Sequence, residues 1–136
     1  MHWRNAWLRR LWLPAVVVLT LLATAAVVTG TGYLDGRTFV GETGEKGKAK
    51  GDPETFVFKD GSFDPLACHK WGFNGAPYTT KEQDGRIQFT SETKSDKEGT
   101  MSWKGAVQGN EISGTVTWTK PGQAPIDYWF KGKQKK

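Results

Sequence analysis

The chain has 136 residues, which is room for one domain, and its 17 glycines and 12% aromatic content suit short strands joined by tight turns. Its net charge of +5 comes from the two ends, because residues 31–130 hold 12 basic and 14 acidic side chains. The basic balance therefore does not indicate a nucleic-acid-binding face on the body of the chain. The single cysteine, Cys68, excludes a disulfide within the chain.

The first thirty residues have the pattern of a membrane-targeting segment. Three arginines precede residues 11–28, which are uncharged and mostly apolar. A basic start followed by an apolar run directs a chain to a translocon and keeps the basic end in the cytoplasm. We therefore expect residues 1–30 to be a signal peptide or a transmembrane anchor. The following domain is expected on the non-cytoplasmic side of the cell envelope, either membrane-anchored or secreted to the periplasm.

Two fates of this segment remain open. Ala23-Thr24-Ala25 is an A-x-A site, which favours cleavage of a signal peptide after Ala25. The apolar run nevertheless continues to Val28, and a helix over residues 11–28 would span about 27 Å, close to the ~30 Å of a hydrocarbon core. Tryptophans at the basic end are also typical of interfacial anchoring.

After residue 30 the chain alternates between apolar and polar residues, with turn signals between the alternating stretches. Asp60-Gly61, Asp84-Gly85 and Gly109-Asn110 are dipeptides typical of hairpin turns. Residues 41–52 are glycine- and charge-rich and predict a mobile loop or a long hairpin connection. The pattern predicts an all-β domain over residues 31–132, followed by a basic tail over residues 133–136.

The clearest passage is residues 99–119, where GTMSW at 99–103 is echoed by GTVTW at 114–118. A two-residue turn at Gly109-Asn110 would put only apolar residues and glycine on one face of this hairpin. A slip of one residue would expose both tryptophans, so burial should fix the register. The facing pairs on the apolar side are then Met101–Trp118, Trp103–Val116, Gly105–Gly114 and Val107–Ile112. The glycine pair would let the sheet bend or another group approach closely.

A sheet that is apolar on one face must cover that face, and no amphipathic helix after residue 30 is available to do so. Sequential strands and bend-permitting glycines favour a small antiparallel up-and-down β-barrel of about seven or eight strands. A β-sandwich is the alternative.

The opening Leu34-Asp-Gly-Arg-Thr-Phe39, the glycine-bent strand pairs and the closing Tyr128-Trp-Phe-Lys-Gly132 resemble lipocalin-like (calycin-type) small β-barrels. The resemblance covers residues 34–132, although Arg37 and Thr38 follow Gly36 where lipocalins have Gly-x-Trp. The Trp-x-Gly and Tyr-Trp-Phe-Lys-Gly elements are also similar to those of exported bacterial proteins. The calycin resemblance implies a ligand cavity inside the barrel rather than a catalytic constellation.

Residues that could form a catalytic or metal site are few. His69 is the only histidine after residue 30, and His69 with Cys68 supplies too few ligands for a closed zinc site. Neighbours in an extended strand point to opposite faces, so a Cys68–His69 dyad would be geometrically poor. No Gly-x-Ser-x-Gly elbow, phosphate loop or dinucleotide fingerprint occurs. The sequence therefore predicts a non-enzymatic domain with no catalytic residues, cofactor or metal, and an enzyme that uses His69 is the competing hypothesis.

The candidate ligand-binding residues are mostly aromatic. One interpretation of the segment after Cys68 is a rim or lid that presents aromatic side chains to a small apolar ligand, and the other is an end plug over a filled core. A ligand-binding barrel should enclose a cavity of about 300 Å³ or more next to the hairpin tryptophans. The candidate residues are Trp71, Phe73, Tyr78, Trp103, Trp118 and His69.

The alternative function is a cell-envelope structural or protein-interaction module, of an inhibitor-like kind, with a filled core. Such a module would act through its outer surface or the 41–52 loop. Trp129 alternates with Tyr128 and Phe130, so it should lie outside the barrel if those two face inward, and it could then contact a partner or the membrane.

Overall fold

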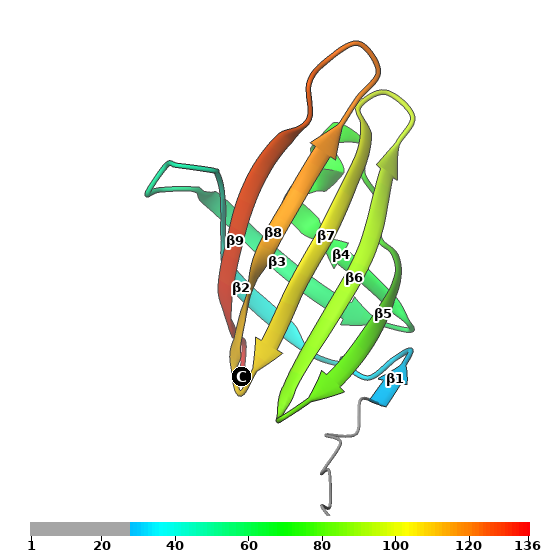
Figure 1. Cartoon of the computed structure of the whole chain (residues 1–136), viewed down its shortest axis with the longest axis vertical. Coiled ribbons are helices and arrows are strands. Elements are labelled where there is room, and N and C mark those ends of the chain that lie inside the picture. The colour runs from blue at the N-terminus through cyan, green and yellow to red at the C-terminus, as the bar shows by residue number, and fades with distance from the viewer. Residues whose placement is uncertain (1–27) are drawn as a thin grey trace, which may run out of the picture.

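The computed structural model describes residues 28–136, which form an antiparallel, up-and-down closed barrel of eight strands (Figure 1). Strands β2 to β9 each pair with the next strand along the chain, and β9 pairs back with β2. The predicted barrel is therefore confirmed over the sandwich. The elements are β1 (Val28–Gly30), β2 (Thr38–Glu45), β3 (Asp52–Lys59), β4 (Ser62–Pro65), the 3₁₀-helix η2 (Leu66–Trp71), β5 (Ala76–Gln83), β6 (Arg86–Ser95), β7 (Gly99–Gln108), β8 (Glu111–Thr119) and β9 (Ile126–Gln134).

The predicted targeting segment lies outside the described residues, except for its last three. These form β1, which pairs with residues 80–82 of β5. Strand β4 pairs with the start of β5, at Ala76 and Pro77. Within residues 28–136, no helix is long and apolar enough to cross a membrane.

The predicted two-residue turns join three of the hairpins. Asp60 and Asp84 have φ angles of 50° and 54°, and each is followed by a glycine with positive φ. Successive residues with positive φ make the type I′ turn, whose twist matches that of the strands it joins. Gly109 opens the β7–β8 turn with φ of 59°, where a first-position glycine suits a type II′ turn.

The register predicted for β7 and β8 is confirmed, including the pairing of Gly105 with Gly114. The ring of Phe130 lies over this glycine pair. A Cβ added to Gly105 would lie 2.6 Å from the Phe130 ring and 2.7 Å from the Phe89 ring. The two glycines therefore make room for aromatic rings in the middle of the barrel.

Aromatic side chains fill much of the barrel interior. Neighbouring rings have centroids 5.0–6.2 Å apart, mostly in tilted or T-shaped contacts. Fully burying each such ring contributes roughly 1.5–3 kcal/mol. This aromatic core consists of Phe39, Phe56, Phe58, Phe63, Tyr78, Phe89, Trp103 and Phe130.

Residues 31–37 close one end of this core. The Leu34 side chain is fully buried there, and its N–H donates to the hydroxyl of Tyr78 at 2.9 Å. The same hydroxyl donates to the Asp35 carboxylate at 2.6 Å.

Arg37 donates to the Gln134 side chain and to the Gly109 carbonyl, so the start of β2 is tied to the end of β9 and to the β7–β8 turn. Strand β9 itself extends to Gln134, so it includes the first two residues of the predicted basic tail.

The 41–52 segment is a hairpin connection, but it is shorter than predicted because β2 runs to Glu45 and β3 begins at Asp52. Glycines occur within β2 for steric reasons. A Cβ on Gly41 would meet the Lys131 carbonyl, and one on Gly44 would meet the ring of Trp129. The loop prediction was wrong for residues 41–45 because these glycines permit close strand pairing.

Candidate functional site

The two ends of the barrel are built differently. The closed end carries residues 31–37, the β5–β6 and β7–β8 turns and the C-terminus (Figure 1). The open end carries η2 and the β6–β7 and β8–β9 connections.

A cavity of about 380 Å³ lies inside the open end. Trp103 and Val116, both buried, form its inner part next to the aromatic core. The half-buried Met101, Trp118 and Tyr128 form its wall on β7, β8 and β9. The remaining lining residues come from β2, β3, the η2 segment and the β6–β7 connection: Thr43, Asp52, Pro53, Glu54, Ala67, Cys68, Lys70, Trp71, Phe73 and Glu98.

The η2 segment lies across one side of this cavity. The helix ends at Gly72, whose φ of 87° favours glycine and whose N–H donates to the His69 carbonyl. Ser95 on β6 donates to the Trp71 carbonyl at 2.8 Å and so fixes the end of η2 to the barrel wall. Phe73 is buried, whereas the Trp71 side chain is 56% exposed. Phe73 therefore helps to fill the interior, whereas Trp71 lies at the rim of the cavity.

Glu54 is a buried carboxylate in the cavity wall, with only 3% of the residue exposed. Its Oε1 accepts the Thr55 N–H at 2.8 Å and the Ala67 N–H at 2.7 Å. Within residues 28–136, its Oε2 accepts one hydrogen bond, from the weak thiol donor of Cys68 at 3.5 Å. Burial raises the pKa of Glu54 above its ordinary value, and the hydrogen bonds partly oppose this effect.

Cys68 is held as a thiol. Burial and the neighbouring Glu54 carboxylate raise the pKa of Cys68 to about 12. Since the thiolate is the nucleophilic form of cysteine, this environment disfavours nucleophilic chemistry at neutral pH.

His69 points away from Cys68. Its Nε2 lies 2.6 Å from the Asp64 carboxylate, on an exposed part of the surface. Residues 66–71 are a 3₁₀-helix rather than the extended strand assumed from the sequence, yet the two side chains still separate. Within residues 28–136, no group of three or more His, Cys, Asp or Glu side chains is arranged to hold a metal ion.

Four of the six residues predicted to bind ligand line the cavity together, namely Trp71, Phe73, Trp103 and Trp118. Tyr78 instead belongs to the closed end, where it binds Leu34 and Asp35. His69 is not part of the cavity lining.

The sequence argument missed Glu54, Met101 and Tyr128 as site residues. Glu54 shares its side of β3 with Phe56 and Phe58, and this period of two is the signal that could have found it.

Charged residues of both signs surround the mouth of the cavity. Asp52 and Glu98 line it, and Glu98 pairs with Lys120 at 3.1 Å. Lys70 is the only basic residue in the lining, and its ammonium lies 5.5 Å from the centroid of the Trp71 ring.

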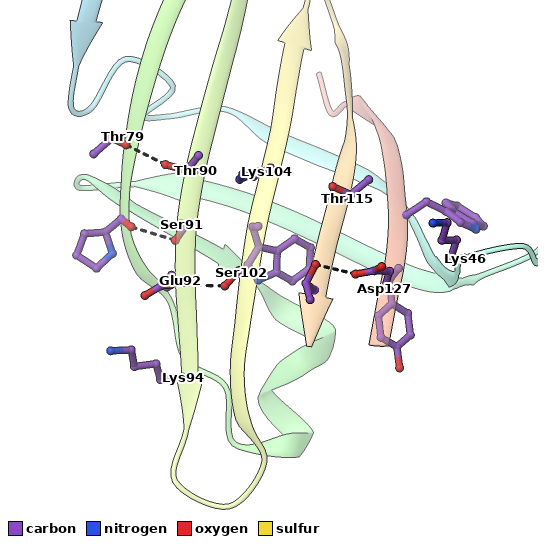
Figure 2. A pocket seen from close by; sticks show the side chains of 15 residues that line it. Lys46, Thr79, Thr90, Ser91, Glu92, Lys94, Ser102, Lys104, Thr115 and Asp127 are labelled. Carbon is purple, nitrogen blue, oxygen red and sulfur yellow. Dashed lines mark hydrogen bonds between the residues drawn. The ribbon is translucent and has the colours of Figure 1, made fainter. Parts of the chain in front are cut away.

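The outer face of β5–β9 carries a second, shallower depression of about 1040 Å³ (Figure 2). Its hydroxyl groups mostly pair with neighbouring side chains. Thr79 and Thr90 lie 3.0 Å apart through their Oγ1 atoms, and Thr117 donates to Asp127 at 2.8 Å. Figure 2 shows these pairs across adjacent strands. The depression is therefore a polar surface whose hydrogen-bonding groups are already largely satisfied.

Trp129 lies on this outer face, as the alternation predicted, but it is half-buried rather than fully exposed. Its ring packs on Gly44, and its Nε1–H donates to the Lys48 carbonyl at 2.8 Å. This tryptophan therefore fixes the β2–β3 connection against β9.

No protein-family model, curated protein or solved structure matches this chain. The closed antiparallel barrel is consistent with the lipocalin-like architecture that the sequence resembles. A fold alone does not define an activity, so the functional argument rests on the cavity and its lining.

Proposed function

We propose that this chain is a non-enzymatic, lipocalin-like binding protein of the cell envelope that holds a small, largely apolar ligand in its open-end cavity. The observation that carries the proposal is the cavity of about 380 Å³ beside Trp103 and Trp118. Its volume falls at the small end of the ~300–1,000 Å³ typical of ligand pockets.

The composition of the cavity wall supports an apolar ligand body. Trp103, Trp118 and Tyr128 offer ring surfaces, and Met101 offers a flexible, polarizable side chain that adapts to different shapes. The aromatic core beside the cavity is closely packed, so a ligand would bind against a preformed surface.

The position of β1 supports an orientation on the membrane. Strand β1 consists of the last three residues of the predicted targeting segment and pairs with residues 80–82, close to the β5–β6 turn of the closed end. An uncleaved anchor would thus join the barrel at its closed end and leave the cavity mouth facing away from the bilayer. Cleavage after Ala25 would release the same barrel, β1 included, into the periplasm.

A fluorescent probe tests cavity binding. The full-length protein in phosphatidylcholine nanodiscs should bind the neutral probe N-phenyl-1-naphthylamine saturably above the background of empty nanodiscs. Thr43→Trp, which fills the cavity from β2, should weaken this binding at least tenfold. Thr115→Trp adds the same side chain on the outer face and should leave binding unchanged. The absence of saturable binding by the unmodified protein, or equal binding by both variants, would overturn the proposal.

The alternative is an interaction module that acts through the outer face, and the depression over β5–β9 favours it. In that case Thr115→Trp would change the set of proteins captured from a membrane fraction, whereas Thr43→Trp would not. The satisfied hydroxyl pairs and the packed Trp129 make this face the weaker candidate.

A further inference from the structure

Glu54 makes no ion pair within residues 28–136, and the charge of His69 lowers the Glu54 pKa less than the hydrogen bonds to its carboxylate do. Only 3% of the residue is exposed. A buried carboxylate without a counter-charge is costly, and proteins usually remove that cost by pairing or by protonation. A cationic occupant of the cavity would supply the missing charge.

The two oxygens of Glu54 have different remaining capacity. Oε1 already accepts two backbone N–H groups, which hold the carboxylate in a fixed orientation next to η2. Oε2 has only the thiol of Cys68 at 3.5 Å, and a carboxylate oxygen can accept stronger and additional donors. An ammonium N–H at Oε2 would form a charge-assisted hydrogen bond of the stronger kind.

The rest of the cavity also favours a cation over an anion. Trp118 and Tyr128 add aromatic rings to the lining, and aromatic rings attract cations, while Asp52 adds negative charge at the mouth. The one lysine in the lining, Lys70, lies over the Trp71 ring on the η2 side of the mouth.

We propose that the ligand is a small organic amine, with its ammonium group on Glu54 Oε2 and its apolar body between Met101, Trp103 and Trp118. This inference rests on the proposed function and specifies the chemical class of its ligand. Glu54 would then select the head group, while the ring-lined wall would bind the body of the ligand.

Three compounds with one phenyl body and different head groups test the assignment on the unmodified protein. They are 2-phenylethylamine, 2-phenylethanol and phenylacetate, each titrated by calorimetry into full-length protein in phosphatidylcholine nanodiscs. We expect the amine to bind at least tenfold more tightly than the alcohol, and the carboxylate to bind most weakly. Equal affinities of amine and alcohol would overturn the amine assignment.

Glu54→Gln keeps an oxygen acceptor for the Ala67 N–H but removes the charge. We expect this variant to lose the tenfold preference for the amine, while a cooperative urea unfolding transition shows that the barrel is still folded. Glu111→Gln, an exposed position at the closed end, is the matched control and should keep the preference. A preference that survives Glu54→Gln would overturn the role of Glu54. Failure of the proposed function is distinct, because it would show as no probe binding by any of these proteins.

Discussion

The closed and open ends of this barrel each bury a polar group, but they treat it differently. At the closed end, the Tyr78 hydroxyl accepts from Leu34 and donates to Asp35. At the open end, Glu54 is also buried and lines a cavity, yet among the described residues its Oε2 accepts a hydrogen bond only from the weak thiol donor of Cys68. The comparison indicates that the closed end satisfies its buried polar group and contributes stability, whereas the open end leaves a cavity beside its buried carboxylate.

The largest expected effect comes from removing one aromatic ring from the packed core and, for comparison, one from the cavity wall of the open end. Phe58→Ala removes a fully buried ring that packs against Phe39, Phe63, Tyr78 and Phe89. We expect the free energy of unfolding, measured by urea denaturation, to fall by about 3–5 kcal/mol. Trp118→Ala at the cavity wall should cost less than half as much, because that side chain is only half-buried. Equal losses would contradict the division between the ends.

The polar group of the closed end provides the next test. Tyr78→Phe removes the hydroxyl and leaves the Leu34 N–H without its acceptor in a buried site. We expect unfolding to become easier by about 1–3 kcal/mol. The measurement is the same urea titration, with Tyr33→Phe as the control, since the Tyr33 side chain is 48% exposed. If both variants lower the free energy of unfolding by the same amount, the hydrogen bonds of the Tyr78 hydroxyl do not stabilise the closed end.

The cavity wall should respond less in stability and more in binding. Trp118→Phe keeps a ring but removes the hydrogen bond from Nε1 to the Glu98 carbonyl. We expect a loss of about 0.5–1.5 kcal/mol in the free energy of unfolding. Probe affinity should fall as well, since Trp118 lines the cavity. A stability loss with unchanged probe affinity would place the bound probe elsewhere.

The smallest expected effect is a pH dependence of stability due to Glu54. Burial raises the pKa of its carboxyl above the ordinary value of 4.5, so at more acid pH both folded and unfolded chains hold the proton. As pH rises above 4.5, the unfolded chain ionises first, and stability falls until the pH passes the folded pKa. Unfolding free energies of the unmodified protein and Glu54→Gln, compared from pH 4 upward, should therefore diverge in favour of the variant. A constant difference would contradict the raised pKa.

Local sequence signals predicted the hairpins because their information lies within a few residues. Asp60-Gly61 and Asp84-Gly85 carry the positive φ angles of their turns, and the alternation around Gly109-Asn110 gave the register of β7 and β8. The glycine pair at 105 and 114 correctly indicated a close approach, although the approaching ring, Phe130, came from a third strand.

Features set by distant contacts were harder to predict. Gly41 and Gly44 belong to a strand because β9 and Trp129 lie against them, which no local pattern indicates. Tyr78 belongs to the closed end because its hydroxyl bonds to Leu34 and Asp35, which lie 44 and 43 residues earlier in the chain. Glu54 was missed because a carboxylate in an alternating strand ordinarily faces solvent.

The indole N–H resonances of the full-length protein in nanodiscs give the most direct test of the binding account. Three of the seven tryptophans, Trp71, Trp103 and Trp118, line the cavity, while Trp129 lies on the outer face. On titration with 2-phenylethylamine, the account predicts saturable shifts of the three cavity indoles with Trp129 unmoved. A shift of Trp129 with the cavity indoles unmoved, or no saturable shift of any of these four, would contradict it.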